Sequence, residues 1–110
     1  MRRAVLSLVL AAVPAVVWAA TLTPSTILAN TAGYDGKSVI VTGKVTGFQT
    51  SQTTMGTVAG FRLCDSDCVL VIDEKGQSRT DGDTATVTGT FHITFKGPKR
   101  SFSNAVVISK

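Results

Sequence analysis

The chain has 110 residues, of which 44% are hydrophobic and 16% are charged. Its formal charge of +4 falls to +2 when Arg2 and Arg3 at the N-terminus are set aside. So small an excess of basic residues does not by itself indicate nucleic-acid binding. Beyond the N-terminal segment no apolar run is long enough to span a bilayer, and the remaining length of about ninety residues corresponds to one domain.

Residues 1–20 have the pattern of a signal peptide. Arg2 and Arg3 precede a largely apolar run over residues 4–17, and Val17-Trp18-Ala19 has the small-residue pattern that a signal peptidase accepts. The alternative is an uncleaved membrane anchor, but the run is short and contains a proline. We therefore expect residues 1–20 to be removed on export, and residues 21–110 to form a domain in the periplasm or outside the cell.

A short helix is expected directly after this leader, over residues 23–30. Thr23 can cap the helix, and Pro24 occupies the first helical position, where its missing N–H costs nothing. Ile27 and Leu28 then supply an apolar face. The sequence therefore predicts one helix at the N-terminal side of the domain.

From residue 37 onward the apolar residues recur with a period of two, which predicts β-strands. A Gly-Tyr-Asp-Gly turn at residues 33–36 leads into the first strand, and two more strands are expected over residues 57–64 and 68–72. An Asp-Gly-Asp turn at residues 81–83 precedes a strand in which apolar residues alternate with threonine, as in a half-buried antiparallel strand. A turn at residues 96–100 leads to the last strand, residues 102–109. The residues predicted to face the core are Val39, Val41, Val45, Ala59, Phe61, Leu63, Ala85, Val87, Phe91, Ile93 and Phe95.

Two of these strands share the pattern Val-Thr-Gly-x-apolar, at residues 41–45 and 87–91. Glycine within a strand usually marks a bulge, a sharp bend or a close approach of another backbone. Two long strands that bend at Gly43 and Gly89 would allow each of them to serve both sheets of a small barrel. We therefore predict an all-β chain with little helix, a five-stranded antiparallel barrel with a short N-terminal helix. A twisted meander folded over the helix is the alternative.

The segments at residues 34–45 and 82–91 resemble the first and fourth strands of OB-fold domains, in particular the exported, single-domain tRNA-anti-like group. The resemblance implies a five-stranded barrel that binds its ligand on strands two and three and on the loops around them. In members that bind nucleic acid it also implies aromatic side chains on which bases stack. Residues 73–82 are too short and too polar for the helix that usually connects strands three and four. The aromatic residues left for stacking are Tyr34, Phe48 and Phe102.

Cys64 and Cys68 enclose an Asp-Ser-Asp loop between two predicted strands. Cysteines outside the cytoplasm are normally oxidised, and positions facing each other at the mouth of a hairpin suit a disulfide. A redox role is the alternative, although redox pairs are typically spaced C-x-x-C at the start of a helix. A zinc site needs four ligands, and His92 is the single histidine of the chain. We expect a structural disulfide.

That disulfide determines which side chains point away from the core. Cys64 shares a face of its strand with Val58 and Arg62. Its partner Cys68 must lie on the same face, together with Leu70 and Ile72. Val69 and Val71 are then left for the core. An exposed apolar patch rimmed by charge is typical of a surface that binds a partner. The alternatives are a bulge that turns part of this face inward, or a helix that covers it. The patch is predicted to contain Ile40, Val58, Leu70 and Ile72, with Lys44 and Arg62 at its margin.

Lys96, Lys99 and Arg100 lie close together in the turn before the last strand. In OB domains this loop often contacts the ligand, so the three side chains are candidates for binding phosphate or carboxylate groups. A solvated, charged turn is the alternative. We include them among the candidate ligand-binding residues.

No residue pattern indicates catalysis. His92 lies among threonines without a nucleophile and an acid nearby in the sequence. The aspartates fall in turns, where they are favoured for local backbone hydrogen bonds, and none has the spacing of a calcium loop. We predict no catalytic residue, no metal site and no cofactor.

The leading hypothesis is an exported, non-enzymatic binding module. It would engage a protein or an oligomeric ligand through the first three strands and the turn at residues 96–100. A second hypothesis is binding of single-stranded nucleic acid, and a third is a small redox or hydrolytic enzyme.

Overall fold

The computed structural model describes residues 20–54 and 56–110. The predicted signal peptide therefore lies, except for Ala20, outside the described residues. The elements, in chain order, are β2 (Thr21–Leu22), α2 (Pro24–Leu28), α3 (Thr31–Tyr34), β3 (Ser38–Thr53), β4 (Gly56–Cys64), β5 (Cys68–Asp73), β6 (Thr84–Lys96) and β7 (Ser101–Ile108).

Helix α2 begins where the sequence predicts it. Thr23 is its N-cap, the Thr23 side-chain oxygen accepts a hydrogen bond from the Thr26 N–H at 3.4 Å, and Pro24 starts the helix. The helix ends at Leu28, earlier than expected. Ile27 is completely buried in the main core cluster, so α2 is held in place by packing as well as by its cap.

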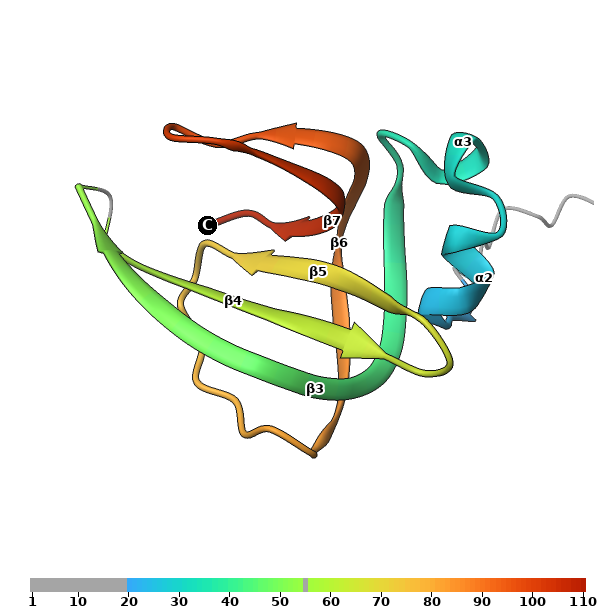
Figure 1. The fold of residues 1–110 in the computed structure, drawn as a ribbon, viewed down its shortest axis with the longest axis horizontal. Coiled ribbons are helices and arrows are strands. Elements are labelled where there is room, and N and C mark those ends of the chain that lie inside the picture. Colours follow the sequence, from blue (N-terminus) through green and yellow to red (C-terminus); the bar gives the residue numbers. More distant parts are fainter. Residues whose placement is uncertain (1–19, 55) are drawn as a thin grey trace, which may run out of the picture.

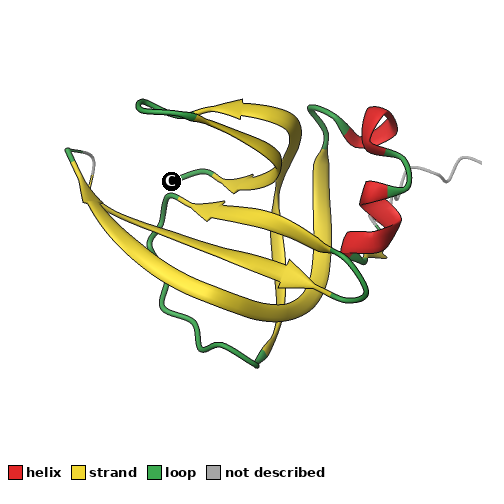
Figure 2. Cartoon of the chain, in the orientation of Figure 1, coloured by secondary structure: helices red, strands yellow, loops and turns green. Residues whose placement is uncertain are grey.

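The strands form a single sheet whose hydrogen bonding returns on itself (Figures 1 and 2). Across the described residues six strands follow the order β2-β3-β4-β5-β7-β6, and an additional β3–β6 pairing joins five of them into a ring. The β5–β7 and β2–β3 pairs are parallel, and the other pairs are antiparallel. The prediction of an all-β chain with little helix is confirmed. The sequence predicted five strands. It did not predict β2, because a strand of two residues is too short to show an alternation of apolar and polar residues.

The two glycines of the repeated pattern lie where strands change partners. β3 pairs with β6 as far as the Lys44–Thr84 pair and with β4 from the Lys44–Cys64 pair onward. β6 likewise changes from β3 to β7 at Thr90. A Cβ on Gly43 would lie 2.8 Å from the backbone oxygen of Cys64, and a Cβ on Gly89 would lie 2.5 Å from that of Val107. Backbones approach too closely there for any side chain, as the glycines predict.

The core lies inside the ring and is built from alternate residues of its strands. Nine of the eleven residues predicted to face the core are buried, whereas Ile93 and Phe95 are only half-buried. Val69 and Val71 of β5 and Val106 of β7 complete the core between the strands. Residues 74–83 contain no helix, and α2, which contacts β3, β4 and β5, packs against these strands instead.

Candidate binding surface

The β4–β5 hairpin is closed covalently at its mouth. Cys64 and Cys68 form the predicted disulfide, with their Cα atoms 4.1 Å apart. Within the loop, the Asp65 N–H donates to the Asp67 carbonyl at 2.8 Å, and the Asp67 N–H donates to the Asp65 carboxylate at 3.1 Å. The loop between the two strands is therefore fixed at both its base and its tip.

Asp65 also joins this hairpin to α2. Its carboxylate accepts the Ser25 N–H at 3.1 Å and the Ser25 hydroxyl at 2.5 Å. The Ser25 hydroxyl bond is the main cause that holds the pKa of the Asp65 carboxyl below its usual value of 3.8. Asp65 thus satisfies a backbone donor in the first turn of α2, which gives this acidic residue a structural role.

The residues of β5 alternate between core and outer surface as expected from the disulfide. Val69 and Val71 are 1% and 0% exposed, whereas Leu70 and Ile72 on the opposite side are half-buried. Arg62 of β4 pairs with Leu70 and is exposed. The predicted outward orientation of Leu70 and Ile72 is therefore present in the structure.

This outer surface continues onto β7, which the sequence analysis did not anticipate. Leu70 pairs with Ala105 and Ile72 with Val107 on the parallel neighbour β7. Because paired residues share a face, these four side chains form one apolar area, which we call the β5–β7 face. Ala105 and Val107 are buried, so Leu70 and Ile72 supply most of its accessible apolar surface.

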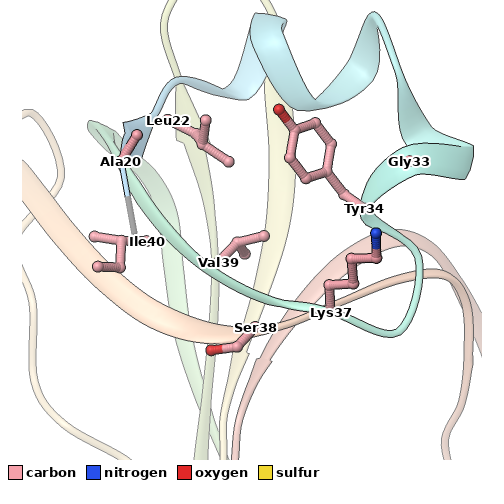
Figure 3. Close-up of a pocket in the computed structure, with 8 residues that line it drawn as sticks. All are labelled: Ala20, Leu22, Gly33, Tyr34, Lys37, Ser38, Val39 and Ile40. Carbon is pink, nitrogen blue, oxygen red and sulfur yellow. The ribbon is translucent and has the colours of Figure 1, made fainter. Parts of the chain in front are cut away.

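The other predicted patch residues divide between two places. Val58 is half-buried and lies on the same side of β4 as Arg62, and Lys44 is exposed beside Cys64. Ile40, in contrast, pairs with Thr21 of β2 and with Thr88 of β6. Figure 3 shows Ile40 beside Ala20, among the residues that line an opening of about 310 Å³ together with Leu22 and Tyr34. The structure therefore places Ile40 apart from the β5–β7 face.

The β6–β7 hairpin carries the predicted basic residues at its tip (Figure 1). Lys96, Lys99 and Arg100 are all exposed. The Arg100 guanidinium lies over the Phe102 ring, 5.0 Å from its centroid, a favourable cation–π arrangement.

Phe95 is the aromatic residue that sequence reasoning misplaced. It pairs with Phe102 across the hairpin and lies with its ring centroid 5.7 Å from that of His92. Alternation predicted an inward side chain, but the β6 segment after Thr90 is paired with β7 alone, so the ring is not enclosed. Phe95 lies next to the end of the predicted strand, and this position could have indicated that its side chain is not enclosed by the core.

The connection between β5 and β6 contains a second cation–aromatic contact that the sequence did not suggest. Arg79 lies over the buried Phe61 ring, 5.4 Å from its centroid, and donates to the Gln77 side-chain oxygen at 3.4 Å. The start of the loop is organised by the buried Asp73 carboxylate, which accepts the Lys75 and Gln77 N–H groups at 2.9 and 3.3 Å. The loop closes over one side of the core without a helix.

Among the described residues, no cluster of three or more His, Cys, Asp or Glu side chains could hold a metal ion. In the same part of the chain no helix has the length and apolarity required to cross a membrane. Comparisons with protein-family models, curated proteins and solved structures found no match to this chain.

Proposed function

We propose that residues 21–110 form an OB-type barrel that is exported and acts as a binding module. Support for the fold comes from the ring of five strands and from the order in which β7, not β6, follows β5, a Greek-key connection. The disulfide agrees with an oxidising compartment. In this interpretation strands one to five of the OB fold, numbered along the chain, are β3, β4, β5, β6 and β7.

The proposed ligand is a protein or an oligomer that lies across β4 and β5 and reaches the β6–β7 hairpin. OB domains bind on strands two and three and on the loops after strands one and four. These regions correspond here to β4, β5, the β3–β4 hairpin and the β6–β7 hairpin. Both hairpins project toward the same side of the molecule in Figure 1, so one extended ligand can contact both.

The observation that carries the proposal is the pairing of Arg62 with Leu70 on the disulfide-closed hairpin. An accessible cation can orient a bound ligand, and the accessible apolar side chains beside it lose contact with water when the ligand covers them. The disulfide and the Asp65–Ser25 bonds hold this hairpin in one conformation before a ligand arrives. Binding to a preorganised surface loses less conformational entropy.

The experiment is a comparison of two double variants as bait in an envelope extract. Arg62→Ala with Leu70→Ala removes the proposed contact, whereas Thr86→Ala with Thr88→Ala changes two exposed residues of β6 and serves as the control. The proposal expects specific proteins or oligomers to be lost from the first bait and kept by the second, with both baits folded by circular dichroism. If both variants capture the same proteins and oligomers as the wild-type bait, the proposal is refuted.

Single-stranded nucleic acid is a second candidate because of the β6–β7 hairpin. Phe95 and Phe102 are half-buried there, and the Arg100 guanidinium lies over the Phe102 ring, a combination that suits stacked bases and phosphates. Titration with a labelled oligonucleotide tests it, since such binding must weaken steeply as salt rises and must fall for Arg100→Ala. Absence of salt-dependent binding rejects this candidate.

We infer binding rather than catalysis from the roles of the polar residues. Asp65 and Asp73 accept backbone hydrogen bonds, both cysteines are in the disulfide, and His92 lies against Phe95. The redox alternative predicts that mild reductant opens the Cys64–Cys68 bond readily, and a bond that resists such treatment by mass spectrometry rejects it.

A further inference from the structure

The β3–β4 hairpin extends beyond the ring as a two-stranded ribbon. β4 pairs with β5 only between Ala59 and Cys64, whereas pairing with β3 continues to the Thr53–Gly56 pair. The projecting end of this ribbon is seen at the left of Figure 1. A two-stranded ribbon with no third strand is at best marginally stable in water, so this segment would be stabilised by a further strand.

The two edges of the ribbon are not equivalent. On the β4 side, the chain at Gly76 approaches so closely that a Cβ there would lie 2.5 Å from the Thr57 backbone oxygen. The β4 edge is therefore occupied at Thr57, and a further strand cannot add to it there.

The β3 edge is covered only as far as Phe48. The Phe48 N–H points away from β4 and donates to the Asp81 carboxylate at 2.9 Å. Because backbone groups of a strand alternate in direction, the N–H and C=O groups of Thr50 and Gln52 point to the same edge. Within the described residues β3 has no strand partner there, since β2 and β6 pair only with its first half.

This open edge lacks the features that normally prevent pairing. Residues 46–60 contain no charged residue and no proline, although edge strands are usually protected by lysine, proline or a bulge. The one irregularity in register lies between Thr46 and Gln49, before the open stretch begins. Thr50, Ser51 and Gln52 thus form a regular, neutral and exposed edge.

We propose that this edge pairs with the same edge of a second copy of the chain, antiparallel and about a two-fold axis at Ser51. In that register Thr50 faces Gln52 of the partner subunit, and both residues present their N–H and C=O groups to each other. The uncharged side chains create no repulsion between identical edges. A second copy is favoured over a flexible peptide because its edge is already ordered, so little conformational entropy is lost.

Substitutions at residue 50 test the pairing by sedimentation equilibrium across protein concentration, on protein expressed from the full chain and purified as the host exports it. Thr50→Pro removes an N–H that points to the open edge and leaves the bonds to β4 intact, so it is expected to abolish dimer formation. At a protein concentration where the wild type is monomeric, its thermal midpoint is expected to equal that of the wild type. Thr50→Val retains the N–H and is expected to dimerise like the wild type. A wild-type chain that stays monomeric up to a concentration of about 1 mM, or a Thr50→Pro variant that still dimerises, overturns the proposal.

A second readout does not depend on the stability of the variant. Residues on the two-fold axis lie about 4.5 Å apart at their Cα atoms in a non-hydrogen-bonded pair, so Ser51→Cys should form an intermolecular disulfide under mild oxidation. Ser103→Cys, at an exposed position of β7, is the control. Cross-linking of the residue 51 variant at least tenfold faster than the control is expected, and equal rates would contradict the pairing.

Discussion

Substitution of Gly89 by alanine tests the ring of strands at the point where β6 changes partner. A Cβ at this position would lie 2.5 Å from the Val107 backbone oxygen and 2.9 Å from its carbonyl carbon. Backbone atoms cannot move aside as the end of a flexible side chain can, so β7 must shift. Forcing extra atoms into a packed site typically costs roughly 1–3 kcal/mol.

Gly60→Ala is the matched control, because it places the same methyl group in a strand of the same sheet. The nearest atom to a Cβ there is the Val71 oxygen at 3.9 Å, an ordinary contact. Alanine reduces the entropy of the unfolded chain, which stabilises by about 0.4–1 kcal/mol where the backbone tolerates it. Gly60→Ala is therefore expected to leave stability unchanged or to raise it slightly.

The assay is urea unfolding of both variants and the wild type, followed by far-UV circular dichroism. For a domain of this size each 1 kcal/mol corresponds to about 4–8 °C in thermal midpoint, so the two variants should be easily separated by heat as well. A Gly89→Ala variant as stable as Gly60→Ala would show that β6 and β7 do not approach closely there. The assignment of the strand change to this glycine would then be wrong.

Further predictions concern helix α2, the Asp65 carboxylate that binds it and the disulfide beside Asp65. Because hydrogen bonds lower the folded pKa of Asp65 below the unfolded value of 3.8, its stabilising effect is present above that pH and is lost as pH falls further. Asp65→Asn should therefore flatten the decrease in thermal midpoint below about pH 4, and Ser25→Ala, which removes the hydroxyl that donates to this carboxylate, should flatten it in the same direction. Replacing Cys64 and Cys68 by serine should reduce the free energy of unfolding by about 2 kcal/mol, as expected for so short a loop; an unchanged urea midpoint would contradict this. Ile27→Ala should cost about 2–5 kcal/mol in urea unfolding because the side chain is completely buried, and the half-buried Leu28→Ala should cost less.

Features that depend on neighbouring residues in the chain could be predicted from the sequence. The start of α2 follows from Thr23 and Pro24, and the inward faces of the strands follow from alternation because each strand has the core on one side. The disulfide was predictable because a three-residue loop places Cys64 and Cys68 opposite each other. The roles of Gly43 and Gly89 were predictable because a strand interior otherwise disfavours glycine.

Features that depend on the pairing of distant segments could not be predicted. The apolar face extends to Ala105 and Val107 because β5 and β7 are parallel neighbours, and nothing in either strand specifies this partner. Ile40 was expected beside Leu70 because both point outward, but β3 changes partner between Ile40 and the part that pairs with β4. The contact of Arg79 with Phe61 depends on the path of an irregular loop, for which the sequence has no periodic pattern.

The most direct test of the proposed binding surface is site-specific photo-cross-linking in cells that express the full chain. A photoreactive amino acid replaces Leu70 in one variant and Thr88, an exposed residue on the outer face of β6, in another. A partner bound across β4 and β5 should give a discrete adduct from residue 70 that Arg62→Ala weakens, with no such adduct from residue 88. If residue 70 gives no adduct, or the same adducts as residue 88, the hairpin is a structural part of the ring of strands and does not bind a partner.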